Sequence, residues 1–286
     1  MAFHWPAFRC LCLSEVLTQF VASLDLVLLF AACKMLSTSD WIYLDLEKSG
    51  CTFMRSILQE LYASDCFVEA RKHSLMLNEV VLPKIMTIRS PHEYYFSLWR
   101  YGLDGRGGFF QTISRLFPGL SRKMYEDGTP EAFGRFLDFV LNSSVRYPNV
   151  SRSDWLPLGF DLYTVRIISM IVPVKRRGDF LQGLGSDFPR PERIIAAVNS
   201  FCPEILLRTK SLNSDFHKLA ENGMLAFMNL PAGWQASFPL VSPRLNQSLS
   251  LRADSLDSFL LPGWRAAIES KSSVAIWMLE KAAAQF

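Results

Sequence analysis

The sequence lacks the compositional biases that mark several classes of protein. Thirty Lys and Arg residues stand against 27 Asp and Glu residues, so the net charge of +3 is too small to indicate nucleic-acid binding. Charged residues make up 20% of the chain and apolar residues 50%, which excludes a disordered or repetitive fibrous protein. A length of 286 residues suffices for one large domain with a buried core, or for two small ones.

The cysteines also lack a pattern. No two of them have the CxxC spacing that is typical of zinc modules and redox motifs, and they suggest no disulfide framework. We therefore expect a reduced protein without a metal site. The six are Cys10, Cys12, Cys33, Cys51, Cys66 and Cys202.

No uninterrupted apolar run is long enough to span a membrane. Residues 10–36 are strongly apolar, but Glu15, Gln19 and Asp25 interrupt them. A spanning helix needs about 20 mostly apolar residues, and a carboxylate near its centre costs about 2.5 kcal/mol or more. We interpret residues 1–40 as an apolar N-terminal extension that contains a buried or interfacial amphipathic helix. A membrane anchor, a signal peptide and a wrongly chosen start codon are the alternatives.

Two segments have the pattern of a strand, a tight loop and a helix. Residues 41–46 are β-rich, and after a turn the apolar positions of residues 52–62 recur at helical spacing. Residues 84–88 predict a second strand, and Pro91 suits the first position of a helix that runs to about Tyr101. The two units together favour an α/β domain with a parallel sheet.

The rest of the chain shows no repeat and no linker, so we expect a single domain over residues 41–286. Gly and basic residues predict a long irregular excursion over residues 102–128. Thr129 suits the cap of a helix, and a β-branched run predicts a buried strand. The expected helices are 129–141, 191–200, one beginning at 211, and 262–284; the expected strands are 163–174 and 204–209.

The loop after the first strand has features of an anion site. Backbone N–H groups at a helix N-terminus attract an anion, Gly50 permits close approach of the backbone, and Lys48 and Thr52 add donors. The order of residues is not that of a Walker A loop, because the lysine precedes the glycine. An ordinary turn between a strand and a helix is the alternative.

The second unit adds two further candidates. Arg89 ends the strand, and Ser97 lies about two turns into the following helix, so the two side chains are suited to grip one phosphate. Between the units, Lys72-His73-Ser74 offers His73 as a proton acceptor, although a lone histidine is more often structural.

At this point the sequence resembles the sulfotransferases that use 3′-phosphoadenosine 5′-phosphosulfate (PAPS). The loop K-S-G-C-T at 48–52 is similar to the K-V-G-C-T or K-T-A-S-T loop of the carbohydrate enzymes, and residues 87–102 resemble their V-I-R-D-P-x-x-R-x-x-S…G block. Residues 72–74 resemble the H-x-H-S element of hexuronic-acid sulfotransferases. Residues 207–216 are similar to the R-x-E-x-L…D-F segment, and residues 246–248 to a late N-x-S element.

The chain also departs from this pattern. The resemblance is dense only over residues 41–102, and four positions carry a different residue type. Glu47 replaces a proline, Ser90 an aspartate, Tyr94 an arginine and Lys210 a glutamate. The missing arginine at position 94 bears on binding of the 3′-phosphate.

The resemblance implies a P-loop-like three-layer fold with a central, mostly parallel sheet flanked by helices. It implies transfer of a sulfuryl group from PAPS to a hydroxyl of a saccharide or polysaccharide, with no metal and no nucleic acid involved. His73 would be the base, and Lys48 would neutralise charge on the bridging oxygen. The implied PAPS-binding residues are Lys48, Ser49, Gly50, Cys51, Thr52, Arg89 and Ser97.

Two other functions stay open. A non-catalytic relative that binds nucleotide or glycan is the main alternative, because of the residues at 90, 94 and 210; a nucleotide kinase is disfavoured by the missing Walker A order. We expect a cytoplasmic protein, since acidic residues interrupt the N-terminal segment. A membrane-anchored or Golgi protein is the alternative, with membrane association through residues 10–36.

Overall fold

The computed structural model describes residues 33–63, 66–67, 76, 79–141, 156, 159–185, 190–237 and 256–286. Residues 1–32, which carry most of the predicted N-terminal extension, and the predicted N-x-S element at 246–248 lie outside these ranges. Of residues 1–40, the segment Cys33–Ser37 forms a strand of the sheet, so the sheet begins before the predicted first strand.

The fold is α/β, with a four-stranded mixed sheet in the order β1-β2-β3-β4. The strands are β1 (Cys33–Ser37), β2 (Ile42–Leu46), β3 (Lys84–Ile88) and β4 (Ile205–Arg208). β1 pairs with β2 antiparallel, whereas β2, β3 and β4 are parallel, with Tyr43 opposite Ile85 and Ile85 opposite Ile205. The predicted strands at 41–46, 84–88 and 204–209 are thereby confirmed, as is their parallel arrangement.

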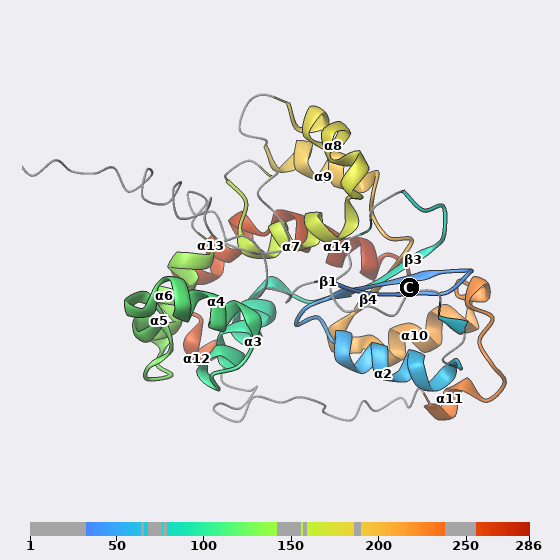
Figure 1. The fold of residues 1–286 in the computed structure, drawn as a ribbon, viewed down its shortest axis with the longest axis horizontal. Coiled ribbons are helices and arrows are strands. Elements are labelled where there is room, and N and C mark those ends of the chain that lie inside the picture. Colours follow the sequence, from blue (N-terminus) through green and yellow to red (C-terminus); the bar gives the residue numbers. More distant parts are fainter. Residues whose placement is uncertain are drawn as a thin grey trace, which may run out of the picture.

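Helices cover both faces of this sheet, which forms the middle layer (Figure 1). The α-helices are α2 (Cys51–Leu61), α3 (Pro91–Leu103), α4 (Gly108–Leu116), α5 (Pro118–Tyr125), α6 (Pro130–Val140), α7 (Leu162–Ile171), α8 (Arg177–Leu184), α9 (Pro191–Asn199), α10 (Leu212–Glu221), α11 (Trp234–Ser237), α12 (Leu256–Phe259), α13 (Pro262–Lys271) and α14 (Ser273–Ala283). Short 3₁₀ turns are η3 (Val174–Arg176), η4 (Thr209–Ser211) and η5 (Ala226–Met228).

Alternating side chains of the strands enter two separate apolar clusters, as expected for a sheet covered on both faces. Tyr43, Ile85 and Leu207 face the cluster formed with α2 and α10. Leu44, Met86 and Leu206 face a larger cluster that includes residues of α3, α6, α7 and α14. The two clusters make the molecule three layers deep around the sheet.

Three predictions of secondary structure were wrong. Residues 163–174 are largely α7, not a strand: Asp161 caps this helix by accepting from the Thr164 N–H, and all ten of its residues are buried. A helix buried on every side has no polar stripe, so its sequence lacks the 3.6-residue period and cannot be told from a buried strand by its pattern.

The segment 102–128, which was predicted to be irregular, contains α4 and α5. The turn before α4 uses Gly105 and Gly107 at positive φ. The helix at 262–284 is divided at Ser272 into α13 and α14.

The capping predictions were confirmed. Thr129 caps α6 by accepting from the Ala132 N–H, with Pro130 as its first residue. Pro91 is the first residue of α3, as predicted, and Ser90, which was not predicted as a cap, caps that helix by accepting from the Glu93 N–H. The Ser90 cap fixes where α3 begins, and hence where Arg89 lies.

Candidate functional site

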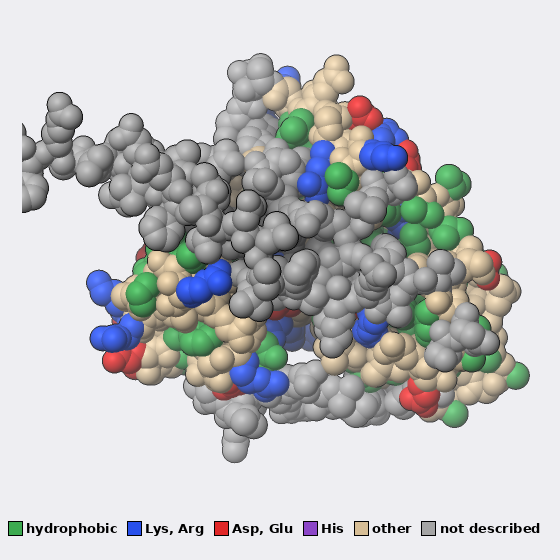
Figure 2. Space-filling model, viewed as in Figure 1, with side chains coloured by type: hydrophobic (Ala, Val, Ile, Leu, Met, Phe, Trp, Pro, Cys, Tyr) green, Lys and Arg blue, Asp and Glu red, His purple; other side chains and the backbone are tan. Residues whose placement is uncertain are grey.

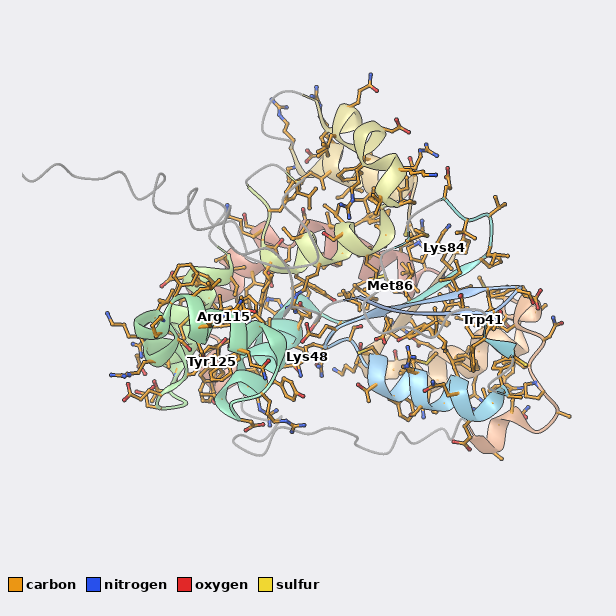
Figure 3. All side chains as sticks on the ribbon, viewed as in Figure 1. Trp41, Lys48, Lys84, Met86, Arg115 and Tyr125 are labelled. Carbon is orange, nitrogen blue, oxygen red and sulfur yellow. The ribbon has the colours of Figure 1, made fainter. Side chains whose placement is uncertain are left out.

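The carboxyl ends of the three parallel strands meet at one edge of the sheet, where α/β proteins generally bind ligands. Leu46 ends β2, Ile88 ends β3 and Arg208 ends β4. The turns that follow lead into α2, α3 and α10, whose N-termini therefore lie at this edge. Figure 3 shows Lys48 there, between the end of the sheet and α3.

The turn from β2 to α2 has an unusual backbone. Lys48 has a φ of 66° and Gly50 a φ of 87°, both in the left-handed region. Ser49 between them is fully buried; its hydroxyl donates to the Leu46 carbonyl at 2.6 Å and lies 3.0 Å from the Thr87 hydroxyl. The buried serine thus anchors the turn to β3, while Gly50 begins the helix.

The residue that follows β4, Thr209, also contacts this turn. The Thr209 hydroxyl lies 2.7 Å from the Ser49 carbonyl oxygen and 3.0 Å from the Ile88 carbonyl oxygen. A Cβ atom on Gly50 would lie 3.3 Å from the Thr209 methyl group. Only glycine therefore meets both the backbone conformation and the space at position 50. Thr209 links all three turns, and its role was not predicted from the sequence.

Arg89 contacts the turn that carries Lys48. Its Nη1 donates to the Lys48 carbonyl oxygen at 3.1 Å, and its Nε lies 3.7 Å from a carboxylate oxygen of Glu93. The Arg89 Nε is buried and has no hydrogen-bond partner among the described residues. The guanidinium thus makes one hydrogen bond to the Lys48 turn, and its Nε lies near the Glu93 carboxylate without a hydrogen bond among the described residues.

The Lys48 ammonium is half-buried and lies 3.1 Å from the centroid of the Tyr101 ring. Burial lowers the pKa of Lys48 to about 8; Glu47 and Cys51 oppose this shift, and the nearby cations Arg166 and Arg89 add to it. Tyr101 was not among the predicted site residues. The Lys48 side chain thus has a low pKa for a lysine and an aromatic partner.

The other predicted residues differ in how they are placed. Cys51 is buried and Thr52 exposed at the start of α2. Ser97 is half-buried on α3, four residues from both Glu93 and Tyr101 and hence on the face that contacts Arg89 and Lys48. Its hydroxyl makes no hydrogen bond within the part of the chain that the structure describes. His73 lies outside the described residues.

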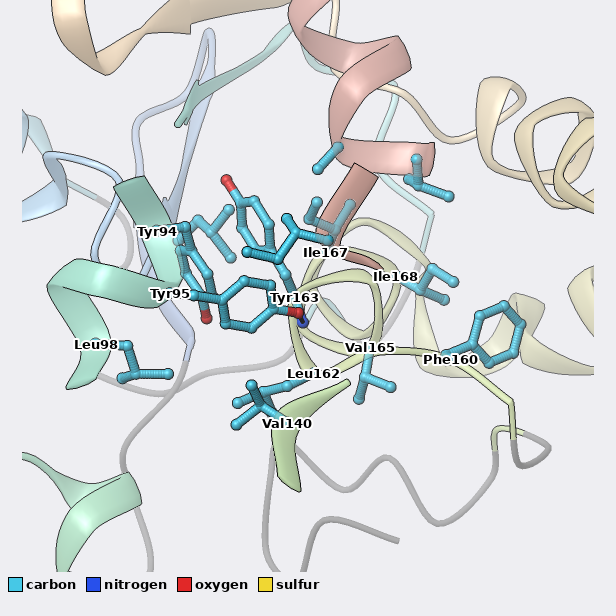
Figure 4. Close-up of a cluster of buried hydrophobic side chains, with 14 of the residues drawn as sticks. Tyr94, Tyr95, Leu98, Val140, Phe160, Leu162, Tyr163, Val165, Ile167 and Ile168 are labelled. Atoms are coloured by element: carbon cyan, nitrogen blue, oxygen red, sulfur yellow. Dashed lines mark hydrogen bonds between the residues drawn. The ribbon is translucent and has the colours of Figure 1, made fainter. Parts of the chain in front are cut away.

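Side chains of helix α7 contact both the turn that carries Lys48 and the turn that carries Arg89. The Tyr163 hydroxyl accepts from the Arg89 N–H at 3.1 Å and lies 3.0 Å from the Arg89 carbonyl oxygen, to which it donates. The Tyr163 ring stacks on Tyr94, with 3.7 Å between centroids (Figure 4). Arg166, 2% exposed, lies 3.1 Å from Glu47 and donates to the Tyr94 hydroxyl at 2.6 Å. An arginine inside an apolar run was the only sequence signal for this cluster.

A pocket of about 560 Å³ opens beside Arg89, between the ends of β3 and β4. The Arg208 guanidinium donates two hydrogen bonds to buried Asp215 and its backbone N–H donates a third, whereas the exposed Lys210 side chain makes no ion pair or hydrogen bond with any described residue. The pocket therefore combines cations with an apolar side chain from α14. Its lining residues are Ile88, Arg89, Ser90, Glu93, Arg208, Thr209, Lys210, Ser211 and Leu279.

On the face that Figure 2 shows, the basic residues do not form one continuous surface. Figure 2 shows Lys and Arg side chains in several separate groups on the face in view, with Asp and Glu beside some of them. Within the described ranges, no three His, Cys, Asp or Glu side chains are grouped as metal ligands would be. No helix in those ranges has the length and apolar character that crossing a membrane requires.

No known protein family, curated protein or solved structure matches the chain.

Proposed function

We propose that the protein is a PAPS-dependent sulfotransferase with a P-loop-like fold, acting on a hydroxyl of a saccharide or polysaccharide. One observation carries the proposal: the Lys48 turn and Arg89 follow neighbouring parallel strands and are joined by a hydrogen bond of 3.1 Å. The two sequence blocks that resemble the sulfotransferases are thus adjacent in space. The choice of a saccharide acceptor rests on the resemblance alone.

The residues at this edge fit a ligand with two anionic groups. Lys48 and the first turn of α2, with Gly50, Cys51 and Thr52, suit the 5′-phosphosulfate. Arg89, whose buried Nε makes no hydrogen bond with a described residue, suits the 3′-phosphate together with Ser97. The pocket beside Arg89, at about 560 Å³, is within the usual size range of small-molecule sites.

The chemistry is a displacement at sulfur, for which PAPS supplies the sulfuryl group. As the acceptor oxygen forms its bond to sulfur and the bridging S–O bond breaks, His73 takes the proton of the acceptor hydroxyl. The Lys48 ammonium balances the charge that develops on the bridging oxygen. For this role Lys48 must exchange its contact with Tyr101 for the ligand.

A non-catalytic binding protein is the second candidate. The observation that favours it is that the Lys48 ammonium, which the reaction needs at the bridging oxygen, instead lies 3.1 Å from the centroid of the Tyr101 ring. Binding of the nucleotide product without turnover would select this candidate.

The test is transfer of labelled sulfate from PAPS to a mixture of glycans. We expect Lys48→Ala to lower turnover by at least about tenfold, and His73→Ala to abolish transfer while nucleotide binding is retained. Lys271→Ala, on exposed α13, is the matched control and should retain wild-type turnover. Wild-type kinetics in Lys48→Ala would remove that lysine from the mechanism, and full turnover in His73→Ala would refute the assignment of the base.

A further inference from the structure

Helix α7 directs two buried polar side chains at the turns that carry Lys48 and Arg89. We propose that Tyr163 and Arg166 are positioning residues, which hold these two turns in the arrangement that binds the anionic groups of the ligand. The inference deepens the proposed function and rests on it for the identity of the ligand. The two residues are three apart and so share one face of the helix.

Tyr163 acts on the backbone of Arg89. Its hydroxyl accepts from the N–H at 3.1 Å and is 3.0 Å from the carbonyl oxygen, so one side chain satisfies both backbone groups of a residue just beyond the sheet. Stacking on Tyr94 at 3.7 Å fixes the ring, and with it the hydroxyl. Removal of the hydroxyl would leave both backbone groups without these partners and free Arg89 to shift relative to β3.

Arg166 acts on the residue before Lys48. Its guanidinium lies 3.1 Å from Glu47 and donates to the Tyr94 hydroxyl at 2.6 Å, with only 2% of its side chain exposed. A buried ion pair adds little stability over an apolar pair of the same volume, and in some proteins it instead specifies the arrangement of the groups around it. We infer that this pair orients the Glu47-Lys48 turn. The tyrosine at 94, where the resembling family has arginine, provides the acceptor that Arg166 requires.

The first test compares Tyr163→Phe with Tyr62→Phe. Tyr62 also donates its hydroxyl to a backbone carbonyl, that of Met228 at 2.7 Å, but at the other end of α2. We expect Tyr163→Phe to speed hydrogen exchange of the Arg89 amide and to weaken binding of 3′-phosphoadenosine 5′-phosphate (PAP) by about tenfold, the effect of one lost positioning contact. Tyr62→Phe should leave the exchange rate of the Arg89 amide and the affinity for PAP within about twofold of the wild-type values, since its effect is on stability alone.

The two readouts separate this inference from the proposed function. An unchanged Arg89 exchange rate in Tyr163→Phe would overturn the inference, and so would equal losses of affinity in the two variants. If wild-type protein bound neither PAP nor inorganic pyrophosphate, the proposed function would fail, while faster Arg89 exchange would still support the positioning role.

The second test concerns Arg166 and avoids an unpaired buried charge. In Glu47→Gln with Arg166→Met both charges are removed together, so we expect the double variant to fold. It should bind PAP about tenfold more weakly than wild type, at a temperature where circular dichroism shows both to be folded. Wild-type affinity in the folded double variant would overturn the role of Arg166.

Discussion

Lys48 and Gly50 both adopt positive φ, at 66° and 87°, within three residues of one turn. For lysine this conformation costs about 1 kcal/mol or more, and such strain is often found at functional sites. The buried Ser49 and the Thr209 hydroxyl hold the turn in place. The glycine and the lysine were predicted from the sequence, but not the threonine, which follows β4 in the 3₁₀ turn η4, far away in the sequence.

Gly50→Ala should destabilise the protein by about 1–2 kcal/mol, because alanine at φ 87° is strained and its Cβ would lie 3.3 Å from Thr209. Gly119→Ala is the control: that glycine has open space around it and no positive φ. The free energies of unfolding in urea provide the measurement. Equal values for the two variants would contradict the account of this turn.

Lys48 should make stability depend on pH. Burial lowers its pKa from 10.5 to about 8 in the folded state, so between these values the unfolded chain binds more protons. The free energy of unfolding contributed by this group should therefore rise with pH through that window, by about 2 kcal/mol after allowance for partial exposure. In Lys48→Met the rise between pH 8 and 10 should be smaller by this amount; the same slope in both proteins would argue against a buried ammonium.

At the scale of elements, the strands and their capped helices followed from local signals. Pro91 and Ser90 begin α3, and Thr129 caps α6, because such caps are satisfied within a few residues of the chain. Helix α7 was missed because its identity depends on tertiary burial, which removes the polar stripe. The missed helix is also the one that supplies Tyr163 and Arg166, so this part of the site could not be predicted from the sequence.

The division between α13 and α14 has a similar origin. At the break, Ser272 is fully buried and donates to the Asp161 carboxylate at 2.7 Å, a contact over 111 positions. Asp161 also caps α7 and accepts from Tyr95. The serine therefore ties the C-terminal helices to the start of α7, and no local pattern reveals this.

Ser272→Ala should lower the free energy of unfolding by about 1–2 kcal/mol, because Asp161 is fully buried and loses one of its donors. Ser273→Ala, at the half-buried neighbouring position, should change it by less than about 0.5 kcal/mol. Chemical denaturation of the two variants gives the comparison. No loss of stability in Ser272→Ala would show that Asp161 does not need this hydroxyl.

At the scale of the whole molecule, the parallel arrangement of β2, β3 and β4 places three turns at one edge. The sequence predicted two of these turns as anion sites, on Lys48 and Arg89, and their contact follows from the pairing of β2 with β3. The pocket beside β4 was not predicted, because its lining combines three segments separated by up to 191 positions, from Ile88 to Leu279.

The central claim is that this edge binds PAPS or its product, and thermal shift with PAP against ATP tests it most directly. At about 100 times its dissociation constant, PAP should stabilise the protein by about 2.7 kcal/mol and raise the melting temperature by roughly 4–6 °C. ATP should give a much smaller shift, Arg89→Ala should lose the PAP effect, and exposed Arg190→Ala should keep it. No stabilisation by PAP, or an equal shift with ATP, would contradict the account.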